Sequence, residues 1–196
     1  MKAWLAVCAL LAGGSIATAA LWGFPDAADD WLAHPLVWQS ADWLTHPWTL
    51  WTSAWVHTSS GNLAGNLLAL AAIAVMGSAV QASWRAALAL AVAWPLSTLA
   101  LLLWPAVTAF AGLGGVIHAA AMVVAVAVSR RPALKPLAPL LLAGMGLKLL
   151  AEQAWRQPVA FDPSWGFNVV YAAHLTGAVA GLACGEAALF WKARPA

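Results

Sequence analysis

Long apolar runs alternate with short polar stretches along most of the chain. Each run approaches the roughly 20 residues that a helix needs to cross the hydrocarbon core of a bilayer, and runs with so few charges are typical of transmembrane helices. We therefore predict an all-α membrane protein with six membrane-spanning helices. The runs cover residues 3–22, 60–82, 86–104, 112–129, 136–155 and 168–191.

The composition supports a membrane protein. Hydrophobic residues make up 63% of the 196 residues, charged residues make up 8%, and the mean hydropathy is +0.80. A soluble domain of this length could not bury so large an apolar share. The net charge of +2 includes no dense basic patch, so we expect no nucleic acid partner. Cys8 and Cys184 fall in the first and last runs, which argues against an extracellular disulfide framework.

The basic residues are unevenly shared among the loops. Lys and Arg gather on the cytoplasmic side of short loops. If the first run starts inside, seven of the nine bases fall inside, Arg156 falls outside and Lys148 lies within a run. We therefore expect both termini on the inside. The inside bases are Lys2, Arg85, Arg130, Arg131, Lys135, Lys192 and Arg194, and the outside acids are Asp26, Asp29, Asp30, Asp42 and Asp162.

The first run has a second interpretation as a cleavable signal peptide. It is apolar and ends in small residues, as signal peptides do. Removal of this run would leave five spans. We prefer the interpretation that keeps it.

Residues 23–56 form one long outer loop that is rich in Trp, Pro and Asp. Aromatic residues at this density are typical of the membrane interface. The pattern of Trp31, Leu32, Leu36 and Val37 predicts short helices lying in the plane of that interface. The loop either anchors the protein there, which we prefer, or forms a substrate-facing surface beside a cleft.

Small residues recur at four-residue spacing in two of the runs. Such stripes allow membrane helices to approach closely, so the last helix is expected to pack tightly and to carry His174 into the bundle. With no internal repeat, residues 1–196 are predicted to form one domain. The small residues are Ala173, Gly177, Gly181 and Gly185 in the last run and Gly61 and Gly65 in the second.

Polar side chains stand near the predicted outer ends of three helices. Because ionisable and strongly polar residues inside a membrane are costly, they are functional candidates. Asn62 and Asn66 share one helix face. His57 precedes them, and His118 and His174 belong to the fourth and sixth runs. All five are expected to converge at one shallow depth.

Two kinds of chemistry suit this set, and a purely structural role is a further possibility. Amides and the free backbone N–H groups of a glycine-rich helix start can form an oxyanion hole, with a His as general base. His57, His118 and His174 could instead hold a metal or haem. The third possibility is polar groups that hydrogen-bond between helices. We prefer the first and expect neither metal nor cofactor.

The sequence resembles the rhomboid intramembrane serine proteases, and in particular the small bacterial branch called rhombosortases. Family members carry His, His and Asn on the second helix, Gly-x-Ser-Gly at the start of the fourth, and Ala-His before small residues on the sixth. The branch also resembles this chain in residues 48–57 and in a Lys then Glu-Gln signature. The matching positions are His57, Asn62, Asn66, Gly112, Leu113, Gly114, Gly115, His118, Lys148, Glu152, Gln153, Ala173, His174, Gly177 and Gly181.

Two positions depart from the family pattern. Gly114 stands where the family has the nucleophilic Ser, and Asn62 stands where it has a His. By resemblance His174 is the base, Asn62, Asn66 and the N–H of residue 114 are oxyanion donors, and His57, His118, Gly112 and Gly115 support the site. Ser59 and Ser60 fall on the oxyanion side and are poor substitutes for the nucleophile. A water activated by His174 would be slow.

The resemblance implies a six-helix rhomboid fold in a bacterial inner membrane, with the site facing the periplasm. Active relatives cleave single-pass proteins that bear a C-terminal sorting segment with a Gly-Gly pair, a transmembrane stretch and a basic tail. We predict a pseudoprotease that recognises such segments within the bilayer. The alternative is an active endopeptidase lineage in which position 114 is substituted.

Lys148 and Glu152 lie four residues apart in the fifth run. This spacing places them on one helix face, where an ion pair offsets the cost of two charges in a membrane. We expect the pair to stabilise helix packing rather than to perform chemistry, and to face no partner elsewhere.

Overall fold

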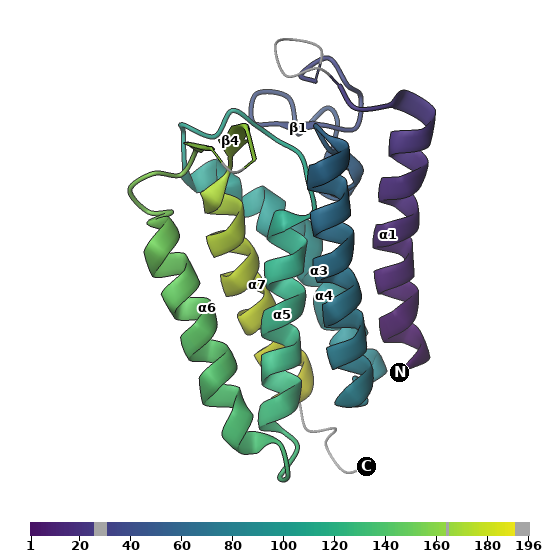
Figure 1. Cartoon of the computed structure of the whole chain (residues 1–196), viewed down its shortest axis with the longest axis vertical. Coiled ribbons are helices and arrows are strands. Elements are labelled where there is room, and N and C mark those ends of the chain that lie inside the picture. Colours follow the sequence, from purple (N-terminus) through teal and green to yellow (C-terminus); the bar gives the residue numbers. More distant parts are fainter. Residues whose placement is uncertain (26–30, 164, 191–196) are drawn as a thin grey trace.

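The computed structural model describes residues 1–25, 31–163 and 165–190. Six helices run side by side (Figure 1), with short helical turns and strands at their ends. The long helices are α1 (Lys2–Trp22), α3 (Ser60–Ala79), α4 (Trp84–Leu99), α5 (Gly114–Ser129), α6 (Ala138–Glu152) and α7 (Tyr171–Phe190). The short elements are α2 (Thr49–Thr52), η1 (Ser53–Trp55), η2 (Ala100–Leu103), η3 (Lys135–Leu137), β1 (Trp38–Gln39), β2 (Ala109–Phe110), β3 (Ala160–Asp162) and β4 (Phe167–Val169).

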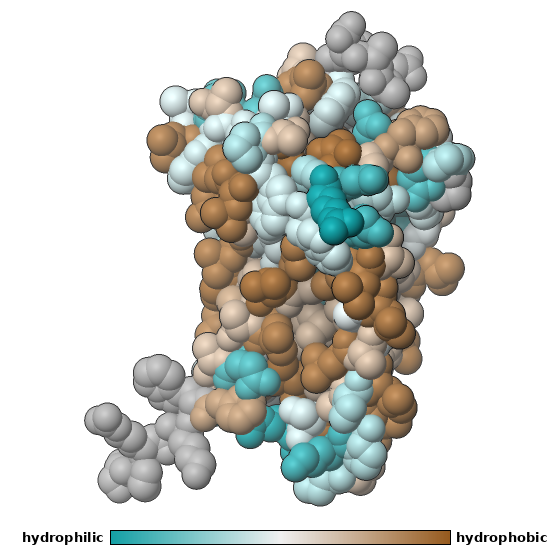
Figure 2. All heavy atoms as spheres, turned by 90° about the vertical axis from the view of Figure 1, so that its left-hand side faces the viewer, coloured by the Kyte–Doolittle hydropathy of each residue, from teal (hydrophilic) through white to brown (hydrophobic). Residues whose placement is uncertain are grey.

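Four of these helices are long and apolar enough to cross a bilayer: α1, α3, α4 continued by η2, and α7. α5 is apolar but shorter, at 16 residues, and α6 has 15. Seen from the α6 side, an apolar band separates two more hydrophilic ends (Figure 2). The chain is therefore a multi-pass membrane protein, and the count of six spans remains a prediction.

α1 begins and α7 ends at the same end of the bundle (Figure 1). Arg131 belongs to this end, where its guanidinium donates to the backbone oxygens of Val80 and Gln81. This arrangement fits an even number of crossings. Asp26, Asp29, Asp30, Lys192 and Arg194, which also entered the charge argument, lie outside the described residues.

The chain is mostly helical, and it adds two short antiparallel strand pairs, β1 with β2 and β3 with β4. One expectation about regular structure was wrong. Residues 31–37 form turns instead of interfacial helices, and the helices of the outer loop are α2 and η1. Pro35 explains the turns, because a proline disfavours helical backbone at the residue before it.

The core is built where α5, α7 and α4 meet. A Cβ on Gly177 would lie 2.0 Å from the carbonyl oxygen of Gly115, and one on Gly181 would lie 2.2 Å from that of Ala119. The small-residue stripe on α7 therefore packs directly on the backbone of α5, as predicted. The stripe on α3 does not pack on a helix, since Gly61 faces open space and Gly65 contacts the Trp165 indole.

α1 is packed into the bundle against α3, α4 and η1. The Trp4 side chain is fully buried and fills a notch at Gly77, where a Cβ would lie 2.1 Å from the indole nitrogen. The Trp55 indole fills a similar notch at Gly14. Cleavage of a signal peptide here would empty the notch at Gly77 and uncover the Trp55 indole.

Neighbouring leucines on α1 provide a test of this packing. Leu11 is fully buried, whereas Leu10 is 55% exposed on the lipid side. We expect Leu11→Ala to lower the free energy of unfolding by about 2 kcal/mol, because truncation of the side chain creates a cavity and removes dispersion contacts. Leu10→Ala should change it by less than about 0.5 kcal/mol. Equal effects in a reversible unfolding assay in mixed micelles would contradict the described packing of α1.

Candidate functional site

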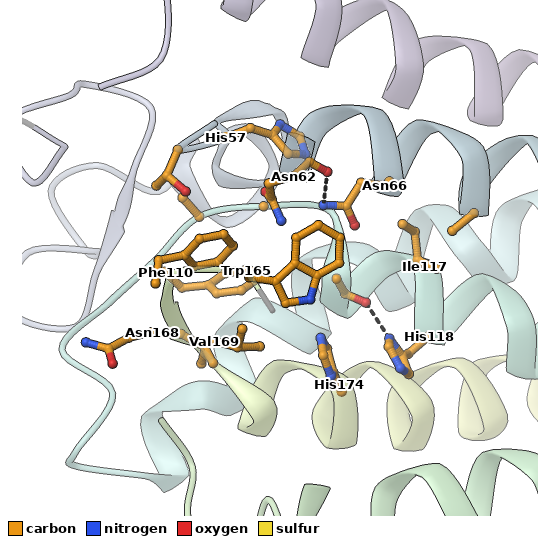
Figure 3. A pocket seen from close by; sticks show the side chains of 18 of the residues that line it. His57, Asn62, Asn66, Phe110, Ile117, His118, Trp165, Asn168, Val169 and His174 are labelled. Atoms are coloured by element: carbon orange, nitrogen blue, oxygen red, sulfur yellow. Dashed lines mark hydrogen bonds between the residues drawn. The ribbon is translucent and has the colours of Figure 1, made fainter. Parts of the chain in front are cut away.

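A cavity of about 860 Å³ opens near the end of the bundle at which α3, α5 and α7 begin. Its walls come from α3, α5 and α6, and the β3–β4 hairpin and His174 of α7 complete it (Figure 3). The positions that the sequence singled out as polar candidates meet here, on four separate segments. Those that line the cavity are His57, Asn62, Asn66, Gly112, Gly114, His118, Lys148 and His174.

The start of α5 presents backbone donors to this cavity. Gly112 has φ of +113°, which L side chains rarely adopt, and its N–H donates to the Ser53 oxygen at 2.9 Å. The chain then turns into α5 at Leu113, and the first backbone bond of the helix runs from Ile117 N–H to the Leu113 oxygen. The N–H groups of Gly114 and Gly115 precede that bond, so they have no acceptor within the helix. We call these two N–H groups the cradle, and their role as oxyanion donors remains a prediction.

His174 lies directly over residue 114. A Cβ built on Gly114 would fall 2.8 Å from His174 Nε2 and 3.1 Å from its Cδ2. The imidazole thus occupies the space that a side chain at position 114 would need. His174 and the start of α5 are therefore adjacent, and the group between them is a hydrogen atom.

The other ring nitrogen of His174 contacts Glu152. Nδ1 lies 2.9 Å from Oε1 and 3.0 Å from Oε2 of that carboxylate. Glu152 also forms the expected ion pair with Lys148 on the same helix. The pair was predicted to face no partner, which is wrong, because the carboxylate reaches across from α6 to α7.

Two aromatic rings hold the imidazole plane. The His118 ring stacks on His174 with centroids 4.2 Å apart and planes 13° apart, and the Tyr171 ring approaches edge-on at 5.8 Å. His118 Nδ1 lies 2.7 Å from the Gly114 carbonyl oxygen, to which it donates. Figure 3 shows His118 and His174 side by side below the start of α5.

The two asparagines differ in how many side-chain N–H groups they can offer to the cavity. Asn66 Nδ2 donates to the backbone oxygen of Asn62 at 3.0 Å, so one of its two N–H groups is used within α3. Asn62 and Asn66 both line the cavity. Ser59 Oγ accepts from the Asn62 N–H at 3.1 Å and caps α3, which makes Ser59 a poor nucleophile. Asn62 therefore remains the better candidate donor.

The alternative metal or haem set of three histidines is not assembled in the part of the chain that the structure describes. Within the described residues, the group of possible metal ligands that includes His118 and His174 has Glu152 as its third member and does not include His57. Imidazole lone pairs lie in the ring plane, so two nearly parallel stacked rings cannot both point at one ion. Lys148 adds a positive charge beside the carboxylate. The geometry therefore fits an oriented base better than a metal centre.

Comparison with known proteins decides the family. The sequence model of the Rhomboid domain matches residues 44–190, which covers most of the chain. The chain belongs to the rhomboid family. A search of curated proteins found no match. α1 precedes the matched region and packs on it, and the residues that line the cavity fall within the matched region except for Trp31.

One wall of the rhomboid cavity was not anticipated from the sequence. Trp165 follows the β3 strand and lies across the cavity in Figure 3, and its ring comes within 2.9 Å of a Cβ built on Gly65. Tyr171 OH donates to Asp162 Oδ2 at 3.0 Å and ties the hairpin to α7. The signal was present in residues 160–169, where aromatic residues flank a turn-forming Pro and Gly.

His57 lies in the loop before α3 and is 3% exposed. Burial lowers the pKa of His57 to about 4, an effect partly opposed by the hydrogen bond to the Trp55 carbonyl oxygen. The neutral imidazole donates from Nδ1, and its buried Nε2 has no hydrogen-bond partner among the described residues. His57 thus supports this rhomboid site as a neutral group.

This burial predicts an acid-dependent loss of stability. Between pH 6.5 and about 4 the unfolded chain binds a proton at His57 that the folded chain does not. The free energy of unfolding should therefore fall by about 3 kcal/mol as the pH drops through this window, and be unaffected above it. His57→Gln should remove this component, whereas His46→Gln, on an exposed His, should retain it. An unchanged pH profile in His57→Gln, measured by unfolding in micelles, would contradict the assignment.

Proposed function

We propose that this rhomboid-family chain recognises the membrane segments of single-pass proteins and does not cleave them. It would act in a bacterial inner membrane with six crossings, both termini in the cytoplasm and the cavity facing the periplasm. The single observation that carries the proposal is the hydrogen at position 114, beside a complete cradle and base. Removal of the nucleophile from a Ser-His pair costs on the order of 10⁶ in turnover.

The cavity is suited to part of a membrane segment. Its volume of about 860 Å³ falls within the range of ligand pockets. Apolar side chains from three helices line its inner part, including Ala69 of α3, Ile117 of α5 and Met145 of α6. Polar groups lie at the level of the cradle. A segment entering between α3 and α6 would place its apolar stretch against the first set and its outer peptide groups beside the second.

We infer a rhombosortase-like choice of clients. The resemblance in residues 48–57, His118 and the Lys148, Glu152 and Gln153 signature supports this branch. Such clients carry a Gly-Gly pair before the transmembrane stretch and a basic tail after it. Trp165 narrows the cavity beside Gly65, and a pair of glycines is the peptide that needs least width there.

A second candidate function is an intramembrane serine endopeptidase lineage with residue 114 substituted. The hydrogen-bonded Glu152–His174 contact favours it, because a base with no remaining task needs no such partner. The two candidates differ in what happens to a bound client.

Site-specific photo-crosslinking would test recognition. The crosslinker would be placed at Met145, which lines the cavity, or at Leu10, which faces lipid. The reporter would be a single-pass protein with a Gly-Gly pair, a transmembrane stretch and a basic tail. We expect full-length reporter to be captured at Met145 and not at Leu10.

Two results would overturn the proposal. Equal capture at both positions would show that the cavity does not select the segment. Cleaved reporter with the unmodified chain would show that an unrecognised nucleophile operates. A reporter with Leu-Leu in place of Gly-Gly is the matched control for the choice of client, and it should be captured less.

A further inference from the structure

We infer that Glu152 is a positioning residue that holds the proton of the neutral His174 imidazole on Nδ1 and leaves Nε2 as a bare acceptor facing position 114. The three groups lie in line from α6 through α7 to the start of α5. The location of the proton does not depend on whether a membrane segment occupies the cavity.

The chemistry of the two groups decides which of them donates the hydrogen bond between Glu152 and His174. An ionised carboxylate has acceptors only, so a hydrogen bond between it and an imidazole requires the imidazole nitrogen to carry the hydrogen. Both carboxylate oxygens of Glu152 are within 3.0 Å of His174 Nδ1. A neutral imidazole has one N–H, so Nε2 then has its lone pair free. Nε2 is also the nitrogen nearest to the side-chain space of Gly114.

The surroundings favour the charged carboxylate. Glu152 is 11% exposed and His174 is 14% exposed, so water competes weakly for their contact. The Lys148 ammonium pairs with the same carboxylate, and the Lys148 side chain is 48% exposed. An adjacent cation favours the ionised form of a carboxylate. Lys148 therefore favours the ionised form of the Glu152 carboxylate, and this carboxylate holds the proton of His174 on Nδ1.

The other neighbours of the ring cannot perform this task. His118 contacts the face of the imidazole and Tyr171 approaches it edge-on, so both restrict the ring plane. Of the three neighbours, Glu152 is the one whose polar atoms lie within hydrogen-bond distance of a ring nitrogen.

Nitrogen NMR of the full chain in lipid nanodiscs, labelled with ¹⁵N-histidine, would read the proton directly. His174→Gln would assign the signals of His174. With the imidazole neutral, we expect protonated Nδ1 and bare Nε2 in the unmodified chain. In Glu152→Gln the proton should move largely to Nε2, because a carboxamide can donate to Nδ1. Glu186→Gln is the matched control on α7, about three turns away along the helix, and should leave the His174 signals unchanged.

Either of two results would overturn the inference. One is protonated Nε2 in the unmodified chain, which decides the question even if Glu152→Gln does not fold. The other is protonated Nδ1 in a folded Glu152→Gln. Because no client is present, a failure of segment recognition would not affect this result.

A kinetic measurement supplies a second readout. When Gly114→Ser cleaves a reporter, adding Glu152→Gln should lower kcat about 10⁴-fold and leave KM unchanged, as expected when the base adopts the wrong tautomer. Glu152→Asp should restore part of the loss, since a carboxylate remains available. A change in KM with kcat preserved would indicate a packing role for Glu152 and contradict the inference.

Discussion

Replacing Gly114 with Ser should convert this chain into a protease, with a gain in reporter cleavage on the order of 10⁶ over the unmodified chain. The hydroxyl would stand between the N–H cradle of α5 and His174 Nε2, where a general base can take its proton. Release of the N-terminal product from the Gly-Gly reporter in membranes is the measurement.

The same substitution meets a steric obstacle. The Cβ of a serine would start 2.8 Å from His174 Nε2, closer than real Cβ contacts, so the imidazole must withdraw by several tenths of an ångström. The ring is the end of a side chain and can rotate, but the contact with Glu152 must lengthen as it does so. We therefore expect the restored enzyme to fall short of a rhomboid whose base evolved beside a serine.

Two companion variants separate these effects. Gly114→Ala adds the same Cβ without the hydroxyl and should remain inactive, while Gly114→Ser with His174→Ala should lose the gained activity. Cleavage by Gly114→Ala would mean that displacement of the ring, and not the hydroxyl, creates activity. An inactive Gly114→Ser that still crosslinks the reporter would show that the site has diverged at more than one residue.

Gly177→Ala should be among the most destabilising single-methyl changes in the chain. Its Cβ would lie 2.0 Å from the Gly115 oxygen and 2.7 Å from the Gly115 carbonyl carbon, both backbone atoms that cannot rotate away. α7 must then move off α5 by about 1 Å, and overpacking of this kind costs about 3 kcal/mol or more. Reversible unfolding in mixed micelles is the measurement.

Gly144→Ala on α6 is the matched control. A Cβ at Gly144 would meet nothing within 4 Å, and alanine is the better helix former by about 1 kcal/mol, so this variant should be neutral or slightly stabilising. If Gly177→Ala proves as stable as Gly144→Ala, the close contact between α5 and α7 is wrong. Because Gly115 adjoins Gly114, the movement should also separate His174 from the cradle.

The sequence predicted the helices and the cradle because their signals are local. A run of apolar residues or a glycine-rich helix start is visible within a window of a few turns. The stripe of small residues on α7 can likewise be recognised within one helix as a signal for close packing, and Gly177 and Gly181 do pack on α5. The number of crossings is less accessible, since α5 and α6 are short for a bilayer.

What the sequence did not predict depends on pairings between distant segments. Lys148 and Glu152 satisfy each other locally, so nothing in their spacing suggests a third partner 22 residues further along the chain. The β3–β4 hairpin is too short to give a repeating pattern, although its aromatic residues were a usable signal. The turns at residues 31–37 mimic helical spacing, and Pro35 was the residue that argued against it.

α6 is held to the rest of the bundle by different contacts at its two ends. All of α6 is described, and its one buried residue is Ala138, at the start of the helix. Leu141, Met145 and Leu149 form a thin apolar stripe against α5 and α7. The outer end is held by Glu152 on His174 and by Ala154, buried just beyond the helix.

Because few contacts hold the end of α6 that carries Glu152, this end could move away from the bundle while the end at Ala138 stays in place. If a membrane segment enters between α3 and α6 by swinging the outer end outward, Glu152 leaves the imidazole before the segment reaches it. His174 would then lack its contact with Glu152 while α6 is displaced and regain it when α6 returns. Entry of a segment and orientation of the imidazole would therefore alternate in time.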